Sequence, residues 1–166
     1  MSPIRMADLV TLDRIVPALY AGNKLQVIEK LSFIVATRSG VDYELVRRRV
    51  WEREDLTTFG IGRGIALPHA TVPGLSEPIG AFARLKQPVD FGAADGRLAD
   101  LVLLLLAPEE DLGILLRALS CVARRLRNPD VINLLRAENS SEAAHVILTT
   151  DSWRGNDPAS HWKRVA

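Results

Sequence analysis

The residues of this chain that are best suited to chemistry lie in one short segment, residues 57–69. Three glycines at alternate positions are followed there by an apolar triplet and the pair Pro68–His69. Alternating glycines favour a loop whose backbone N–H groups turn toward a ligand, often an anion. Pro68 fixes its own φ and biases the preceding Leu67 toward an extended conformation. The pattern therefore predicts a rigidly presented His69 beside a glycine-rich rim.

Histidine exchanges protons, metals or phosphoryl groups near neutral pH. The chain has three histidines, and the other two lie in less informative surroundings. His145 falls in a short helical pattern, and His161 falls in a polar C-terminal stretch. A lone histidine after proline is often only a loop or partly buried residue. His69 is nevertheless the first candidate for a functional side chain.

Several common kinds of site do not fit the segment around His69. The glycines lack both the GxGxxG spacing of dinucleotide-binding loops and the Gly-Lys-Ser/Thr ending of a P-loop. No HExxH motif occurs, and a single cysteine cannot build a thiolate cage, so we expect no metal. No GxSxG elbow presents a serine nucleophile. A covalent phosphohistidine remains, because an imidazole nitrogen can attack phosphorus and pass the group on.

A phosphoryl group needs N–H donors, hydroxyls and cations around its oxygens. The candidate groups are the backbone of Gly62 and Gly64, the hydroxyl of Thr58, and the guanidinium groups of Arg63 and Arg53. Arg53 is also compatible with a simple surface charge at the end of a helix.

Composition narrows the class of protein further. The 166 residues, 48% hydrophobic and 25% charged, are typical of one soluble domain. A net charge of +1 gives no electrostatic case for nucleic acid or an anionic membrane. The lone Cys121 fits a reducing, cytoplasmic setting and a packing role. The apolar run 98–107 is shorter than the roughly 20 residues of a membrane-spanning helix, so we expect a buried strand.

Hydrophobic periodicity and capping residues predict the order of the elements. We expect helices over residues 23–40, 42–53, 111–127, 130–137 and 140–148, strands over 79–85 and 101–106, and turns over 88–97. This order predicts an α/β fold: a single-domain sandwich with a small mixed β-sheet flanked by helices. The domain is expected to span residues 1–150, followed by a polar tail over 151–166.

Roughly residues 10–150 resemble a known family, including the apolar run 101–108, the helical stretch 115–127 and two more specific motifs. The first is Arg53-Glu54 followed by Thr58-x-Gly60-Ile61-Gly62-x-Gly64-Ile65-Ala66-Leu67-Pro68-His69, and the second is Pro88-Val89-Asp90-Phe91-x-Ala93-x-Asp95-Gly96. They are similar to the enzyme IIA domains of the bacterial phosphoenolpyruvate-dependent sugar phosphotransferase system. The resemblance is to the fructose/mannitol type, which includes the nitrogen-regulatory proteins.

The resemblance implies the mannitol-type IIA fold and a place in a phosphoryl relay rather than a stand-alone enzyme. His69 would accept the phosphoryl group on Nε2 from a phosphohistidine of the carrier HPr or its nitrogen-branch paralogue NPr. Arg53 would neutralise the phosphoryl charge. No cofactor and no membrane-embedded part are implied.

Two positions depart from the family pattern. Leu115 aligns with a second active-site histidine that many members carry, and Arg63 stands where asparagine is frequent. An extra cation at Arg63 is expected to stabilise phosphorylated His69 and slow onward transfer. Three functions stay open: a regulator read through its phosphorylation state, a transport component that passes phosphate to a IIB domain, and a binding module that carries no phosphate.

Overall fold

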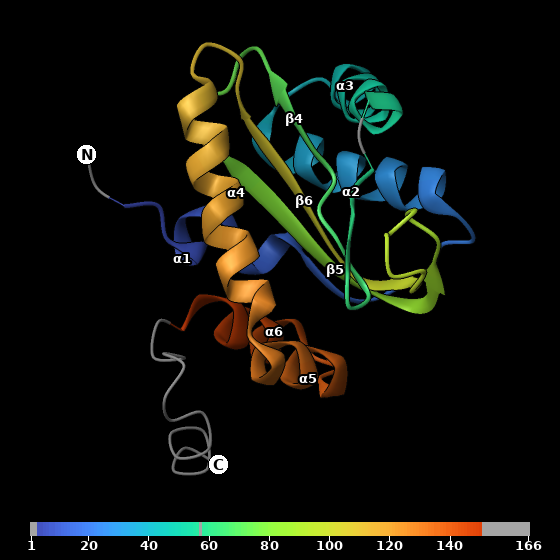
Figure 1. Ribbon diagram of the computed structural model, residues 1–166. Coiled ribbons are helices and arrows are strands. Elements are labelled where there is room, and N and C mark those ends of the chain that lie inside the picture. Colours follow the sequence, from blue (N-terminus) through green and yellow to red (C-terminus); the bar gives the residue numbers. More distant parts are fainter. Residues whose placement is uncertain (1–2, 57, 151–166) are drawn as a thin grey trace.

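The computed structural model describes residues 3–56 and 58–150 (Figure 1). Thr57 and the expected C-terminal tail, 151–166, lie outside these residues. The elements are α1 (Met6–Leu9), η1 (Leu12–Arg14), β1 (Ile15–Leu19), α2 (Lys24–Ser39), α3 (Tyr43–Leu56), β2 (Gly60–Gly62), β3 (Ile65–Ala66), β4 (His69–Val72), β5 (Ile79–Val89), β6 (Ala99–Pro108), α4 (Leu112–Arg127), α5 (Pro129–Ala137) and α6 (Ser141–Thr149).

The strands form one six-stranded mixed sheet, in the order β1-β5-β6-β3-β2, with β4 also paired to β6. β5 runs antiparallel to β6, whereas β3 and β4 run parallel to β6 one after the other along its other edge. Helices α2 and α3 cover one face, and α4 crosses the other (Figure 1). The predicted single-domain sandwich with a small mixed sheet is therefore confirmed.

Strand β6 lies at the centre because its side chains are apolar on both faces. Leu103 and Leu105 pack toward α4, while Leu104 and Leu106 pack toward α2 and α3, and all four are fully buried. A near-continuous apolar run is typical of a strand covered on both faces. Two hydrophobic layers thus share one strand, which gives β4 a rigid neighbour on which to pair.

The long helices begin and end where their capping residues predict. The Asn23 carboxamide oxygen accepts from the Gln26 N–H at 2.9 Å, and Gly40 ends α2 with a φ of 77°. The Asp111 carboxylate accepts from the Gly113 N–H at 2.9 Å at the start of α4. These are the usual N-cap and left-handed C-cap solutions for the unpaired backbone groups of helix ends.

In the β1–β5 pair the structure differs from the sequence expectation. β1, which the sequence did not reveal, pairs parallel with β5, and Pro17 is tolerated there because β1 ends the strand order of the sheet. β5 continues to Val89 and so includes part of the stretch expected to be turns. Its pairing with β6 shifts between Arg84 and Val89, and this irregularity absorbs the change from strand to turn.

Candidate functional site

His69 is the first residue of β4, and the backbone on both sides of it is fixed. β4 pairs with β6 so that His69 stands opposite Leu105. The Leu105 N–H donates to the Pro68 carbonyl at 2.9 Å, and the Leu67 N–H donates to the Phe59 carbonyl at 2.9 Å. The rigid presentation predicted from the Pro68–His69 pair therefore has a physical basis in the central strand.

The imidazole of His69 is held in one orientation. Its Nδ1 lies 2.7 Å from the Leu67 carbonyl oxygen. Because a carbonyl only accepts, Nδ1 carries the proton in the neutral ring, and Nε2 keeps its lone pair. The Phe59 ring, itself buried, lies 5.2 Å from the imidazole, centroid to centroid, at a 56° tilt. The local backbone and the Phe59 ring therefore fix both the orientation of the imidazole and the position of its proton.

The surroundings of His69 favour its neutral form. Partial burial lowers the pKa of the imidazole, and the positive charge of Arg53 lowers it further. The Leu67 carbonyl acts in the opposite direction but does not outweigh burial. Since the pKa falls from an ordinary value of about 6.5, the ring is mostly unprotonated at neutral pH. A neutral imidazole is the form that can attack phosphorus.

We expect the NMR titration of the His69 ring to have its midpoint below about 6.5. Because the Arg53 charge disfavours the protonated ring, Arg53→Ala should move that midpoint upward. Ring resonances of the isotope-labelled protein, followed against pH in both forms, provide the measurement. A wild-type midpoint above the ordinary histidine value would contradict the burial argument.

Arg53 lies in the last turn of α3, and its side chain is exposed. Within residues 3–56 and 58–150 no hydrogen bond or ion pair engages its guanidinium group, yet its charge acts on His69. An arginine fork that is unpaired among the described residues and whose charge reaches the His69 ring is of the kind that binds dianionic groups. The phosphoryl-binding role that the resemblance implies for Arg53 stays a prediction.

The end of α3 that carries Arg53 is anchored by a contact that sequence reasoning missed. The Glu54 carboxylate is buried and pairs with Lys24 Nζ at 2.5 Å, at the start of α2. Lys24 also lies over the Trp51 ring, 5.7 Å from its centroid. One turn earlier, Arg49 pairs with Glu109 at 2.7 Å. The partners of Glu54 and Arg49 are 30 and 60 residues away, so no local pattern could have revealed these pairs.

The glycine-rich segment is a β-hairpin rather than an open loop. β2 and β3 are joined by Arg63 and Gly64, whose φ angles are 59° and 79°. Positive φ at both central residues defines the type I′ turn that matches the twist of paired strands. The family's frequent asparagine at the position of Arg63 is explained by this turn, because asparagine tolerates left-handed geometry.

The groups of this hairpin that were expected to hold a phosphoryl group have partners elsewhere in the fold. The Arg63 N–H donates to the Asp95 carboxylate at 2.8 Å, and its guanidinium donates to the Arg127 carbonyl at 3.1 Å. A Cβ on Gly64 would lie 2.4 Å from a guanidinium nitrogen of Arg136. The anion that the hairpin backbone binds is thus the protein's own Asp95.

The remaining expected ligands are likewise engaged in packing. The Thr58 hydroxyl donates to the Phe91 carbonyl, and a Cβ on Gly62 would lie 3.1 Å from the Asp95 carboxylate. β3 pairs with β6 at Leu101, whereas His69 pairs at Leu105, so the hairpin turn lies farther along the sheet. The charge of Arg53 acts on the His69 ring, whereas the guanidinium of Arg63 is engaged at the Arg127 carbonyl.

We expect Arg63→Asn to yield a more stable protein than Arg63→Ala, by about 0.5–1 kcal/mol. Both variants lose the guanidinium, but only asparagine tolerates a φ near 59°, which costs an ordinary L-residue roughly 1–2 kcal/mol. Urea unfolding of the two variants beside wild type measures the difference. Equal stabilities would mean that the turn is not strained at this position.

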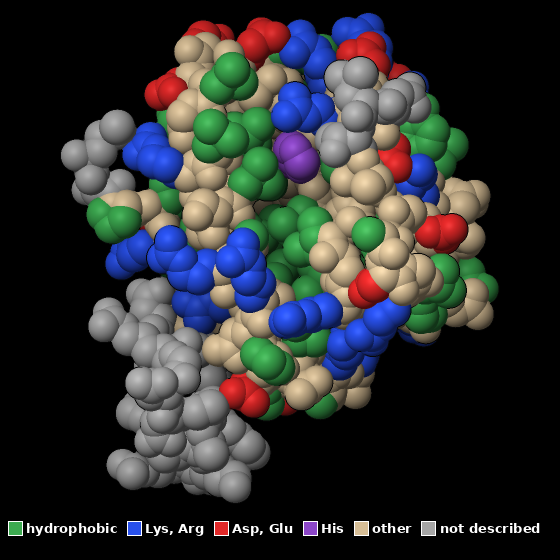
Figure 2. All heavy atoms as spheres, in the orientation of Figure 1, with side chains coloured by type: hydrophobic (Ala, Val, Ile, Leu, Met, Phe, Trp, Pro, Cys, Tyr) green, Lys and Arg blue, Asp and Glu red, His purple; other side chains and the backbone are tan. Residues whose placement is uncertain are grey.

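Leu115 is buried on α4, with 2% of its surface exposed. It belongs to the same hydrophobic cluster as Leu67, which accepts the His69 hydrogen bond, and Leu105, which pairs with His69. The side chain therefore packs into the layer beneath the site. On the outer side of the same helix, Leu112 and Leu116 are 62% and 66% exposed. In the view of Figure 2, a histidine reaches the surface between hydrophobic and basic side chains.

The family model described as "Phosphoenolpyruvate-dependent sugar phosphotransferase system, EIIA 2" matches residues 8–150. The chain belongs to this family. A "Nitrogen regulatory protein" of Bradyrhizobium diazoefficiens is 39% identical to this member of the EIIA 2 family over 143 residues. The alignment covers 86% of this chain and 94% of that protein. The resemblance to IIA domains is therefore confirmed.

Solved structures place this EIIA 2 chain in the same fold. The crystal structure of nitrogen regulatory protein IIA-Ntr from Neisseria meningitidis superposes with a TM-score of 0.80 at 31% identity, covering 87% of this chain and 98% of that one. The crystal structure of IIA mannitol from Escherichia coli gives a TM-score of 0.72 at 22% identity, covering 84% and 99%. No helix among the described residues is long and apolar enough to span a membrane.

Proposed function

We propose that this protein is a phosphohistidine-carrying regulatory IIA component, which accepts a phosphoryl group on His69 and controls partner proteins through its phosphorylation state. The observation that carries the proposal is the 2.7 Å contact from Nδ1 of His69 to the Leu67 carbonyl, which leaves Nε2 free and nucleophilic. The donor is the phosphohistidine of HPr or of its nitrogen-branch paralogue NPr, and the exchange takes place in the cytoplasm.

The transfer itself is a simple exchange of P–N bonds. The Nε2 lone pair of His69 attacks phosphorus while the bond from phosphorus to the carrier's imidazole breaks, and its electron pair returns to the carrier nitrogen. Positive charge develops on the His69 ring as the new bond forms. The Leu67 carbonyl, already bound to Nδ1–H, stabilises that charge, because its oxygen carries a partial negative charge.

In the transfer, Arg53 acts on the phosphoryl group. A phosphoryl group adds close to two negative charges at neutral pH. The Arg53 guanidinium, with no partner among the described residues, can bind the phosphoryl oxygens as they approach Nε2. The Arg53 charge, which adds to the effect of burial in lowering the pKa of the imidazole, thus also stabilises the phosphorylated product.

The regulatory role rather than sugar transport is favoured by Leu115. Where many relatives carry a second imidazole, this buried leucine provides no hydrogen-bond donor for a transferring phosphoryl group. Transfer to a IIB domain therefore lacks a source of transition-state stabilisation. The 39% identity to a nitrogen regulatory protein supports the same choice.

The test is a reconstituted relay of phosphoenolpyruvate, enzyme I and carrier with the full chain. Intact mass should rise by one phosphoryl unit only when every component is present, and the group should return to the carrier. A panel of fructose- and mannitol-type IIB domains is then added. Transfer to any of them as fast as the exchange with the carrier would identify the protein as a transport component. If the mass does not rise at all, the protein is a binding module that carries no phosphate.

A further inference from the structure

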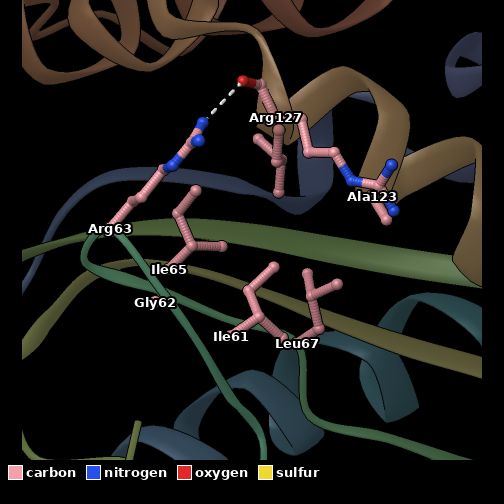
Figure 3. Close-up of a pocket in the computed structure, with 8 residues that line it drawn as sticks. Ile61, Gly62, Arg63, Ile65, Leu67, Ala123 and Arg127 are labelled. Atoms are coloured by element: carbon pink, nitrogen blue, oxygen red, sulfur yellow. Dashed lines mark hydrogen bonds between the residues drawn. The ribbon is translucent and has the colours of Figure 1, made fainter. Parts of the chain in front are cut away.

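A cleft lies between the β2–β3 hairpin and the C-terminal half of α4. Its volume is about 380 Å³. It is lined by Ile61, Gly62, Arg63, Ile65, Leu67, Ala123, Leu126 and Arg127. In Figure 3 the apolar side chains from the hairpin point toward α4, and Arg63 reaches across to the Arg127 carbonyl. The cleft thus has an apolar floor and a basic rim.

The side chains that reach the rim of this cleft are mainly basic, and the Asp95 carboxylate beside the hairpin accepts from the Arg63 N–H. Helix α4 contains four arginines and no acidic residue. Within the described parts of the chain, Arg63, Arg124 and Arg127 are exposed and form no salt bridge. Figure 2 shows basic side chains gathered over the lower part of α4, with hydrophobic side chains in the hollow beside them. Because the net charge of the whole chain is only +1, the positive charge of this surface comes from the clustering of arginines on it.

Arg63 is held at this rim at a cost. A φ of 59° is strained for arginine, whereas glycine or asparagine would adopt it readily. Strain of this kind, of order 1–3 kcal/mol, tends to occur where a side chain has a function to perform. Here the side chain spans the cleft and is held there by a 3.1 Å bond to the Arg127 carbonyl. The positive rim is therefore ordered before any partner arrives.

The shape of the cleft decides between a small molecule and a protein. Small-ligand sites typically enclose 70–90% of their ligand. In this cleft the lining residue Ile61 is 50% exposed, so an occupant would stay open to solvent on one side. An apolar centre with an arginine-rich rim is instead the pattern of a protein-binding surface, where one buried anchor is surrounded by charges.

We propose that this cleft docks an acidic segment of a partner protein, which inserts one apolar side chain between Ile61, Ile65 and Leu126 and sets its carboxylates against Arg63 and Arg127. The cleft adjoins the phosphorylation site through Leu67, which lines it and whose carbonyl binds His69 Nδ1. Docking itself needs no phosphoryl group. The inference therefore stands or falls separately from the proposed phosphorylation of His69.

The test uses the isotope-labelled full chain and a short synthetic peptide with a central leucine flanked by glutamates. Amide shifts on titration should be saturable and centred on the hairpin and the C-terminal half of α4. Arg127→Glu and Ala123→Gln should each weaken binding by about fivefold or more, through charge and occupancy of the cleft. Arg48→Glu on α3, where the side chain is 64% exposed, is the matched charge control and should change affinity little. His69→Ala should bind as wild type does.

Three outcomes would overturn the proposal. Shifts centred on His69 would assign the acidic peptide to the phosphorylation face. Non-saturable shifts at every exposed arginine, equally affected by Arg48→Glu, would reduce the effect to bulk charge. No shifts at millimolar peptide would mean that the cleft does not bind this chemistry. A peptide with alanine in place of the central leucine should lose most of the affinity, because it lacks the anchor.

Discussion

Replacing His69 with alanine is expected to abolish phosphorylation of the protein by its carrier, to less than about 1% of the wild-type rate. The imidazole supplies the only bond to phosphorus in the proposed reaction, so no neighbouring group can substitute for it. The measurement is intact mass during the relay reaction, with phosphoenolpyruvate, enzyme I and carrier in excess. The fold should survive, because the half-buried ring makes its hydrogen bond to the Leu67 carbonyl and not to a distant element.

The matched control for this variant is His145→Ala. His145 lies in α6, on a different part of the chain, and nothing comparable to the Pro68–His69 backbone holds it. His145→Ala should be phosphorylated at the wild-type rate. If His69→Ala is fully phosphorylated and His145→Ala is not, the reactive residue is His145 and the assignment of His69 is refuted.

Arg53→Ala is expected to slow phosphorylation by at least about tenfold, which corresponds to about 1.4 kcal/mol of transition-state stabilisation. The reason is the loss of the guanidinium, whose positive charge stabilises the negative charge of the incoming phosphoryl group. The stability of the fold should change little, since the side chain is exposed at the end of α3. Rates are measured by rapid quench with phosphorylated carrier, and stability by urea unfolding.

Two further variants separate charge from geometry at Arg53. Arg53→Lys keeps the charge but loses the planar fork, so the rate should lie between wild type and Arg53→Ala. Arg48→Ala removes an exposed arginine earlier on the same helix, paired to Glu52 at 4.0 Å, and should leave the rate unchanged. If Arg53→Ala transfers as fast as Arg48→Ala, Arg53 is only a surface charge.

Much of the fold could be predicted from the sequence because its signals are local. Asn23, Asp111 and Ser140 accept from backbone N–H groups where their positions before apolar-periodic segments predict caps. The apolar run of β6 predicts a doubly covered strand, and the structure buries it on both faces. β1 escaped prediction because it is short, contains Pro17, and depends on its pairing with β5 for its conformation.

The site was predictable where the chain itself sets the geometry. Pro68 and the extended Leu67 predict a rigidly presented His69 from local sequence, and the pairing with β6 adds support that the sequence did not reveal. The open anion-binding loop expected around Arg63 is instead a hairpin, because a Gly-x-Gly spacing fits both an anion loop and a tight turn. What separates the two is the Asp95 carboxylate, which lies 32 residues away and accepts the Arg63 N–H. The Glu54–Lys24 pair that anchors α3 could not be predicted either, because its two residues are also far apart in the sequence.

The most direct test of the central claim is to locate the phosphoryl group at atomic resolution. The isotope-labelled protein is phosphorylated through the relay, and long-range nitrogen–proton NMR correlations of the His69 ring are recorded. We predict phosphorus on Nε2, with Nδ1 still bearing its proton and donating to the Leu67 carbonyl. Phosphorus on Nδ1, on any other residue, or on no residue at all would contradict the account.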